Sequence, residues 1–248
     1  MKEWFSEQPL GFVDIGARGG VHPLVAPLGD CVSVLGFEPD KQAAKESGVN
    51  CFPFALSNKP GRVTLWHCAA PTNDSLRPIN QQFVDRYRMV KFAQTGSEEI
   101  HAATLDMTME IIPWQGEFLK LDTQGTEYEI LEGATRTLRD RTAAIYCEVE
   151  FAQIYEGQKL FSDVEHLLRR FGFSFIGFDN MSYRSRWRMG RERLLHADAL
   201  FIKDPLEQTI SHRQAQVAAM ACRLCGYDDL YREIVEMLYP EPVPVEAM

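Results

Sequence analysis

The sequence predicts an α/β fold built on a doubly wound, mostly parallel sheet. Apolar runs of strand length alternate with segments of helical periodicity from residue 12 to residue 178, which is the order that βαβ units produce. The first apolar run ends in an acidic residue and a glycine-rich turn, and the second also ends in an acidic residue. This arrangement is typical of the nucleotide-binding half of such a fold.

The overall composition argues against several classes of function. A net charge of -9 argues against a nucleic-acid partner. No apolar window is long enough for a membrane span, and the N-terminus lacks the apolar core of a signal peptide. We therefore expect a cytoplasmic protein with reduced cysteines. Cys222 and Cys225 form a lone CxxC inside a helical segment, which does not predict a metal site.

The first quarter of the chain is expected to supply four strands, at residues 12–16, 32–37, 49–56 and 62–68. Pro23 and Pro27 make the segment between the first two strands short or irregular. Residues 41–47 are predicted to be helical and to end at Gly48. The alternating pattern of residues 62–68 indicates a half-exposed strand, which a turn at 57–61 would join to 49–56 as a hairpin.

The middle of the chain returns to alternating elements after an irregular stretch at 69–100. The expected elements, in order, are a helix near 78–93, a short strand at 99–105, a helix at 105–112, a central strand at 117–122, an amphipathic helix at 125–138 and a strand at 143–149.

The last third is expected to begin with a helix at 162–171, with Ser162 as its N-cap and Gly172 at its end. Two more strands follow, at 173–178 and 199–202. Residues 206–239 predict two helices, and the tail from Pro240 is expected to be loose. We divide the chain into a domain at 1–205 and a helical extension at 206–248, which packs on the domain or forms a homodimer contact.

The glycine turn predicts a nucleoside ligand. Gly16 and Gly20 allow backbone to approach a ligand, although any tight turn between strand and helix favours glycine. Glu38, at the end of the next strand, can accept both ribose hydroxyls of a dinucleotide or of S-adenosylmethionine. A pyrophosphate prefers GxGxxG, and Arg18 fits that pattern poorly. With Asp14 before the turn, the D-x-G-x-x-x-G order suits a sulfonium with an amino-acid tail.

Several motifs resemble the FkbM family of methyltransferases. Residues 118–134, from Phe118-Leu119-Lys120-Leu121-Asp122-Thr123-Gln124-Gly125 to Gly133-Ala134, resemble its signature segment. Further similarities lie in Asp14-Ile15-Gly16-Ala17, Phe37-Glu38-Pro39, Phe54-Ala55-Leu56-Ser57, Asn73-Asp74-Ser75-Leu76, Glu148-Val149-Glu150-Phe151 and Asp198-Ala199-Leu200-Phe201. Arg18 stands where the family usually has Asn.

This resemblance implies a class I methyltransferase fold, which is Rossmann-like, with seven strands and one antiparallel strand in the final hairpin. It also implies S-adenosylmethionine as cofactor and methyl transfer to a hydroxyl of a sugar, glycan or natural product. By position, Asp14, Gly16 and Gly20 would line the methionine end of the cofactor, and Glu38 the ribose. Ala55, Leu56 and Ser57 would lie near the adenine. The cofactor site would also include Ala17, Pro39, Asp122 and Gln124.

Asp122 is the first candidate for the catalytic base, because it ends the central strand where open α/β sheets place ligands. Glu148 ends the next strand and would share the role or orient the hydroxyl. The alternatives are a helix N-cap for Asp122 and outward strand-end acids for Glu148 and Glu150. A Mg²⁺ ion on Asp122 and a neighbouring acid is compatible with the sequence but not required by it. His67 and His101 are weaker candidates for the base.

Residues 183–196 contain five arginines and two aromatic residues. The segment predicts a gate for an anionic or sugar acceptor, or else a solvated hairpin. The acceptor pocket is expected within 69–100 and 180–196. Two other functions stay open, a nicotinamide-dependent oxidoreductase and a non-catalytic cofactor-binding relative.

Overall fold

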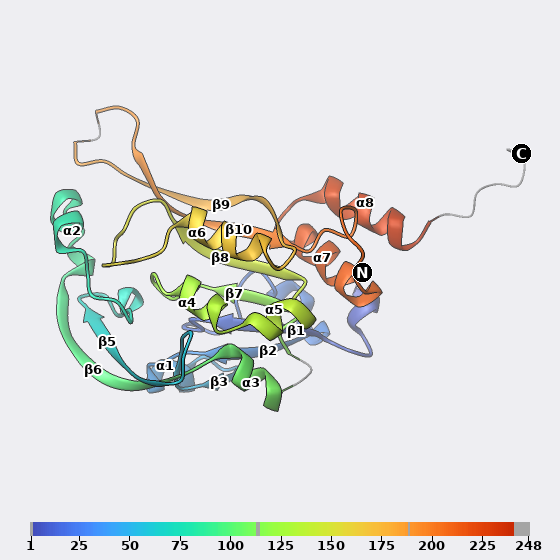
Figure 1. Ribbon diagram of the computed structural model, residues 1–248, viewed down its shortest axis with the longest axis horizontal. Coiled ribbons are helices and arrows are strands. Elements are labelled where there is room, and N and C mark those ends of the chain that lie inside the picture. The colour runs from blue at the N-terminus through green and yellow to red at the C-terminus, as the bar shows by residue number, and fades with distance from the viewer. Residues whose placement is uncertain (1, 113–114, 188, 241–248) are drawn as a thin grey trace, which may run out of the picture.

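The computed structural model describes residues 2–112, 115–187 and 189–240, and it is organised around a seven-stranded sheet (Figure 1). The strand order is β3-β2-β1-β7-β8-β10-β9. β10 runs antiparallel to both of its neighbours, and every other neighbouring pair is parallel. The strands are β1 Leu10–Ile15, β2 Val32–Phe37, β3 Asn50–Phe52, β7 Phe118–Leu121, β8 Ala144–Glu150, β9 Ser174–Arg184 and β10 Arg193–Ile202. The predicted doubly wound sheet with an antiparallel strand in its final hairpin is confirmed.

Helices cover both faces of this sheet, because its strands are apolar on both sides. Val13, Ile15 and Leu119 belong to a core that includes residues of α3 to α6, whereas Phe12 and Phe118 belong to a core with α7. The α-helices are α1 Lys41–Glu46, α2 Gln81–Tyr87, α3 Leu105–Ile111, α4 Glu127–Glu132, α5 Thr135–Asp140, α6 Phe161–Arg169, α7 His212–Leu224 and α8 Asp228–Leu238. Short 3-10 helices occur at Lys2–Phe5, Ala26–Cys31, Pro71–Asn73 and Val90–Phe92.

A second, three-stranded sheet corrects the prediction for residues 49–68. The predicted strand at 49–56 is two strands in different sheets, β3 in the large sheet and β4 (Ala55–Leu56) in the small one. Pro53 lies between them and has no N–H with which to continue the first ladder. β5 (Gly61–Cys68) pairs with β6 (Gln94–Ala103), not with 49–56, so the predicted hairpin is wrong. β6 is also longer than the strand predicted at 99–105.

The predicted helix at 125–138 is interrupted, because Gly133 separates α4 from α5. A Cβ at Gly133 would lie 2.3 Å from the carbonyl oxygen of Ser57, so this close approach requires glycine. The predicted N-cap Ser162 is also wrong. The helix begins at Phe161 after Leu160, whose backbone N–H donates to the Asp163 carboxylate at 3.0 Å.

The last two strands are longer than predicted, and they form a hairpin whose tip projects beyond the body of the molecule above α2 (Figure 1). At the opposite end, α7 and α8 confirm the two predicted C-terminal helices, and α7 buries Val217, Ala218 and Cys222. Ser211 caps α7 through the N–H of Gln214. The part of the predicted loose tail at 241–248 lies outside the described residues. Within the described residues, no helix has the length and apolar character that crossing a membrane requires.

Candidate active site

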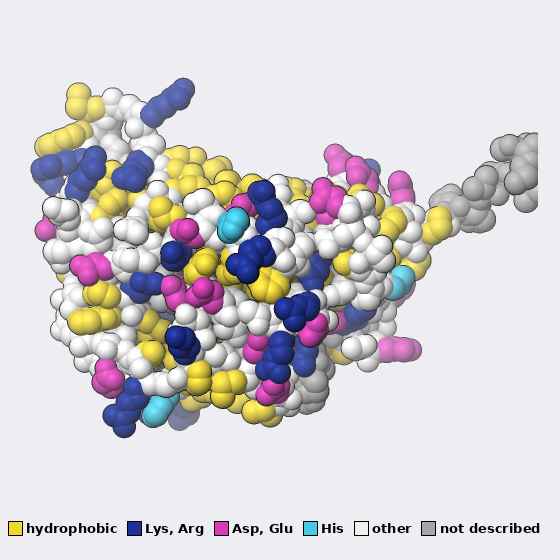
Figure 2. Space-filling view, in the orientation of Figure 1, with side chains coloured by type: hydrophobic (Ala, Val, Ile, Leu, Met, Phe, Trp, Pro, Cys, Tyr) yellow, Lys and Arg dark blue, Asp and Glu magenta, His cyan; other side chains and the backbone are white. Residues whose placement is uncertain are grey.

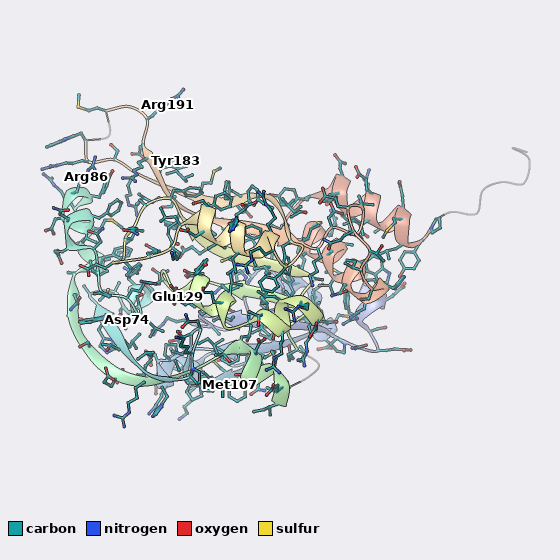
Figure 3. The ribbon with its side chains drawn as sticks, in the orientation of Figure 1. Asp74, Arg86, Met107, Glu129, Tyr183 and Arg191 are labelled. Carbon is teal, nitrogen blue, oxygen red and sulfur yellow. The ribbon has the colours of Figure 1, made fainter. Side chains whose placement is uncertain are left out.

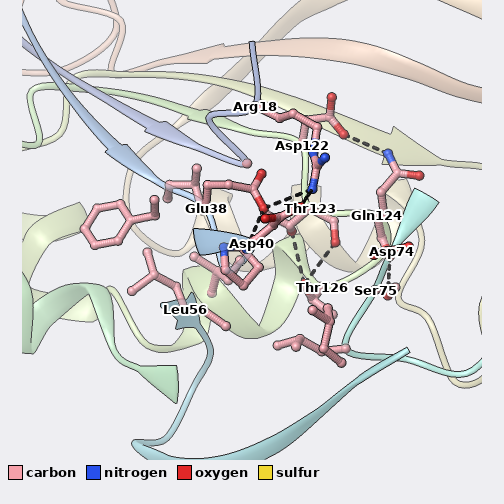
Figure 4. Close-up of a pocket in the computed structure, with 18 of the residues that line it drawn as sticks. Arg18, Glu38, Asp40, Leu56, Asp74, Ser75, Asp122, Thr123, Gln124 and Thr126 are labelled. Atoms are coloured by element: carbon pink, nitrogen blue, oxygen red, sulfur yellow. Dashed lines mark hydrogen bonds and ion pairs between the residues drawn. The ribbon is translucent and has the colours of Figure 1, made fainter. Parts of the chain in front are cut away.

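A cavity of about 270 Å³ opens at the carboxyl ends of β1, β2 and β7. Parallel strands end at one edge of a sheet, so the polar residues that follow them converge there. The small sheet and the segment that connects its strands β5 and β6 supply the other wall (Figure 4). The cavity is lined by residues 15, 16, 18, 22, 37–40, 54–56, 65, 71, 72, 74–76, 120, 122–124, 126 and 130.

The glycine turn after β1 forms the floor of the cavity. The backbone N–H groups of Gly16 and Ala17 donate to the Phe37 carbonyl at 2.9 and 3.0 Å. Gly16 has φ +85°, and a Cβ there would lie 2.0 Å from the Asp122 carbonyl oxygen. The turn can therefore pack against the end of β7 only with glycine at this position. Gly20 and the buried Ala17 are outside the cavity lining.

Beneath the turn lies a buried ion pair. Lys120 Nζ is 3.0 Å from Asp14 Oδ1 and donates to the Gly16 carbonyl at 3.2 Å. The two residues are directly paired on β1 and β7. Burial raises the pKa of Asp14 despite the lysine. Asp14 thus holds Lys120 rather than lining the cavity. The sequence contained a signal for this ion pair that was not used: a lysine inside a buried strand, such as Lys120, requires a partner for its charge.

Glu38 and Asp40 form an acidic rim that is paired with Arg18. The Arg18 guanidinium lies 2.9 Å from Asp40 Oδ2 and 3.5 Å from Glu38 Oε1. Burial raises the pKa of Glu38, and Arg18 opposes this increase. Asp40 also begins α1 by accepting from the N–H groups of Gln42 and Ala43. The predicted position of Arg18 away from the sulfonium stays a prediction.

The wall next to Glu38 is apolar. It contains Phe37, Phe54, Ala55 and Leu56, and the rings of Phe37 and Phe54 are 5.6 Å apart. Pro39 also lines the cavity, whereas Ser57 does not. The structure therefore places Ala55 and Leu56 in the cavity wall, and their contact with an adenine stays a prediction.

Gln124 joins the two candidate catalytic acids. Its Nε2 donates to Asp122 Oδ1 at 2.8 Å and to Glu148 Oε2 at 3.1 Å. Its Oε1 accepts from the Tyr155 hydroxyl at 2.9 Å. Gln124 has φ +58°, a left-handed conformation that is unusual for this residue type. The side chain is thus fixed by three polar partners at the end of β7.

Sequence reasoning missed His196 in this network. Its Nδ1 lies 2.9 Å from Glu148 Oε1. Burial and the Asp122 carboxylate raise the pKa of Glu148 to about 8, and the hydrogen bond to Glu148 raises the pKa of His196. No strand-end motif marked His196, because it reaches the site from β10 only through the antiparallel pairing with β8. Glu148 does not line the cavity itself.

Further polar residues surround this end of the site. The Tyr146 hydroxyl donates to Asp198 Oδ2 at 3.1 Å, and Asn180 Nδ2 donates to the same oxygen at 2.8 Å. His22 lines the cavity with its ring 6.2 Å from that of Tyr146. Burial lowers the pKa of His22.

The other candidates lie elsewhere. His67 is 2.8 Å from Asp74, and His101 is exposed on β6. None of the described residues in 183–196 lines the cavity, and Arg188 lies outside the described residues. The acceptor gate stays a prediction. No group of three His, Cys, Asp or Glu side chains is arranged to hold a metal within the described part of the chain.

Comparison with known proteins identifies the family. The Methyltransferase FkbM domain matches residues 14–175, which is more than half of the chain. No curated protein matches the sequence.

Two solved structures of low identity also match the chain. Methyltransferase FkbM from Methylobacillus flagellatus KT is 13% identical with a TM-score of 0.46, and the match covers 78% of this chain and 43% of that chain. This chain thus spans less than half the length of that protein. Magnesium protoporphyrin IX methyltransferase (ChlM) from Synechocystis PCC 6803, solved with bound SAM, is 12% identical with a TM-score of 0.38, and the match covers 82% of this chain and 76% of that chain. On the strength of the domain match, the chain belongs to the FkbM methyltransferase family.

Proposed function

We propose that the protein is an S-adenosylmethionine-dependent O-methyltransferase that acts on a hydroxyl of a sugar, glycan or natural product. The observation that carries this proposal is that Glu38 and Asp122, which end β2 and β7, line one cavity with the glycine turn between them. In this proposal, Glu38 holds the ribose and Asp122 receives a proton.

The residues present fit the cofactor by their chemistry. The Glu38 carboxylate can accept hydrogen bonds from the two ribose hydroxyls. Phe54 and Leu56 offer an apolar surface to a purine ring, and Gly16 leaves backbone open to the methionine end. When bound, S-adenosylmethionine supplies a methyl group that its positively charged sulfonium already activates.

Asp122 is the base in this proposal. A sugar hydroxyl is a weak nucleophile, so removal of its proton by a carboxylate favours its attack on the methyl group. Gln124 holds Asp122 Oδ1 and fixes the direction of the carboxylate. Glu148 retains a proton near neutral pH because of its raised pKa. It acts through Gln124 as a positioning residue rather than as a second base.

The polar groups beside Asp122 support a hydroxyl-bearing acceptor. His22 lines the cavity, and Asp74, Ser75 and Thr123 add further polar groups to its lining. Imidazole, carboxylate and hydroxyl groups can bind several hydroxyls at once. A shared fold does not fix the substrate of its site, so the identity of the acceptor must be measured.

Binding titrations test the cofactor. S-adenosylhomocysteine is expected to bind and NADH is not. Glu38→Gln should weaken S-adenosylhomocysteine binding about tenfold, since a charged acceptor is lost. The matched control is Glu46→Gln, an exposed acid on α1 outside the cavity lining, which should keep the wild-type affinity. Binding of NADH alone would indicate an oxidoreductase, and binding of neither would indicate a non-catalytic relative.

Turnover tests the base. Methyl transfer to a panel of sugars and glycans is measured with labelled S-adenosylmethionine. Asp122→Asn should bind S-adenosylhomocysteine normally but lose about two to four orders of magnitude in kcat. Unchanged turnover in Asp122→Asn would remove Asp122 from the mechanism.

A further inference from the structure

Six arginines gather on one projecting part of the molecule, which we call the basic tip. Arg86 and Arg88 lie at the end of α2, and the others lie in the β9–β10 hairpin, at Arg184, Arg186, Arg191 and Arg193. Figure 2 shows the dark blue side chains at this edge, and Figure 3 locates Arg86 and Arg191 there. All six are exposed, and none forms an ion pair within the described residues.

Large apolar side chains are exposed on the same surface. Met189 is 90% exposed and Trp187 64%. Figure 2 shows hydrophobic side chains at the outer end of the hairpin, next to the arginines. A methionine and a tryptophan that remain in water at a hairpin tip indicate a surface that binds something apolar.

The two parts of the basic tip are held together. The Arg88 guanidinium lies 5.6 Å from the centre of the Trp187 ring, and that of Arg186 lies 4.9 Å from it. At the start of β10, where the loop of the hairpin ends, the Arg193 guanidinium lies 5.6 Å from the ring of the buried Phe83 on α2. The arginines and the apolar residues therefore form one surface rather than two separate segments.

The chemistry of this surface favours a lipid bilayer over a dissolved anion. The whole chain carries a net charge of -9, so six unpaired arginines make the tip opposite in sign to the rest. A dissolved phosphate or acidic glycan would match the arginines but leave Met189 in water. An anionic membrane offers both partners, since its headgroups attract arginine and its interface accommodates tryptophan and methionine.

We propose that the basic tip docks on the surface of a bilayer that contains anionic phospholipids. The arginines contact the headgroups, while Trp187 and Met189 enter the interface. β10 connects the tip to the active site, because the strand that begins at Arg193 also carries His196. Docking would therefore place the bilayer on the side of the molecule where His196 and Glu148 lie.

Vesicle flotation with the full chain tests this proposal. The protein should float with vesicles of phosphatidylcholine and phosphatidylglycerol but not with phosphatidylcholine alone, and added salt should weaken the binding. Reversal of three charges, Arg184→Glu with Arg186→Glu and Arg191→Glu, should reduce partitioning at least about tenfold. The matched control reverses three exposed arginines elsewhere, Arg62→Glu with Arg170→Glu and Arg232→Glu, and should keep most of the binding.

Tryptophan fluorescence separates membrane docking from anion binding. Anionic vesicles should shift the emission to shorter wavelength, and Trp187→Phe should lose this shift. The proposal is wrong if both triple variants lose vesicle partitioning to the same extent. It is also wrong if dextran sulfate or RNA binds as tightly as vesicles and leaves the Trp187 emission unchanged, because the tip would then be a site for soluble polyanions.

Discussion

Glu148 on β8 and His196 on β10 lie in diagonal positions of two antiparallel strands, with Glu148 Oε1 2.9 Å from His196 Nδ1. Neither residue is fully buried, yet the pKa of each is raised. The pair retains a proton at the edge of the active site near neutral pH, and Gln124 connects it to Asp122.

Stability should fall as this pair loses its protons. The pKa of Glu148 rises on folding from 4.5 to about 8, so folding favours its neutral form. The stability that results is complete below about pH 4.5 and lost as the pH rises through about 8. Glu148→Gln should flatten the decrease in unfolding free energy over this range by an amount on the order of a few kcal/mol.

Urea denaturation at a series of pH values measures this effect. The control is Glu156→Gln, an exposed acid in the loop after β8. This variant should keep the wild-type slope of unfolding free energy against pH. A wild-type slope in Glu148→Gln would show that other buried acids cause the decrease.

Two glycines of one turn provide a matched test of close packing. Gly16 and Gly19 both have positive φ, but a Cβ at Gly16 would lie 2.0 Å from the Asp122 carbonyl oxygen, whereas one at Gly19 would meet nothing within 4 Å. Gly19→Ala should cost about 1 kcal/mol of stability from backbone strain, and Gly16→Ala about 3 kcal/mol or more. Thermal and urea unfolding measure both variants, and equal losses would rule out the steric argument.

The buried pair of Asp14 and Lys120 should be expensive to break from one side. Asp14→Ala leaves an unpaired ammonium group in a buried position, and the expected loss is about 3–5 kcal/mol of unfolding free energy. The double variant with Lys120→Met should recover much of this loss. As a control, Glu165→Ala removes the partner of the exposed Arg169 on α6 and should cost less than about 1 kcal/mol. A double variant less stable than Asp14→Ala would contradict this account.

Arg18 is expected to set the pH dependence of cofactor binding. Its guanidinium opposes the increase that burial causes in the pKa of Glu38. Without it, Glu38 becomes protonated at a higher pH and accepts hydrogen bonds from ribose less well. S-adenosylhomocysteine affinity of Arg18→Ala should therefore fall more steeply than that of the wild type as the pH drops below neutral. Parallel pH profiles in calorimetry would show that Arg18 does not act through Glu38.

The large sheet and its acidic strand ends were predictable because both depend on local patterns. Glu38 and Asp122 follow apolar runs of strand length, and parallel strands bring their ends to one edge. The division between β3 and β4 had one local signal, Pro53, which cannot continue the first ladder, but the sheet that each strand joins is decided by tertiary pairing. Gly133 likewise ends α4 for a reason outside the helix, namely its approach to Ser57.

The missed site residues depend on contacts between distant parts of the chain. His196 reaches Glu148 through β10, Tyr155 reaches Gln124 from the loop after β8, and Lys120 is held by Asp14 on another strand. Spacing within one segment cannot show such contacts. A charged residue inside an apolar run, as at Lys120, is the one signal that points to a distant partner.

The small sheet pairs separately from the large one, and this affects which sequence changes the active site can tolerate. β4, β5 and β6 hydrogen-bond among themselves and not with the large sheet, yet Ala55, Leu56 and Leu65 line the cavity. Residues 71, 72 and 74–76, between β5 and β6, also line the cavity. Changes within this connection can therefore reshape one wall of the active site without moving the register of the strands that precede Glu38 and Asp122.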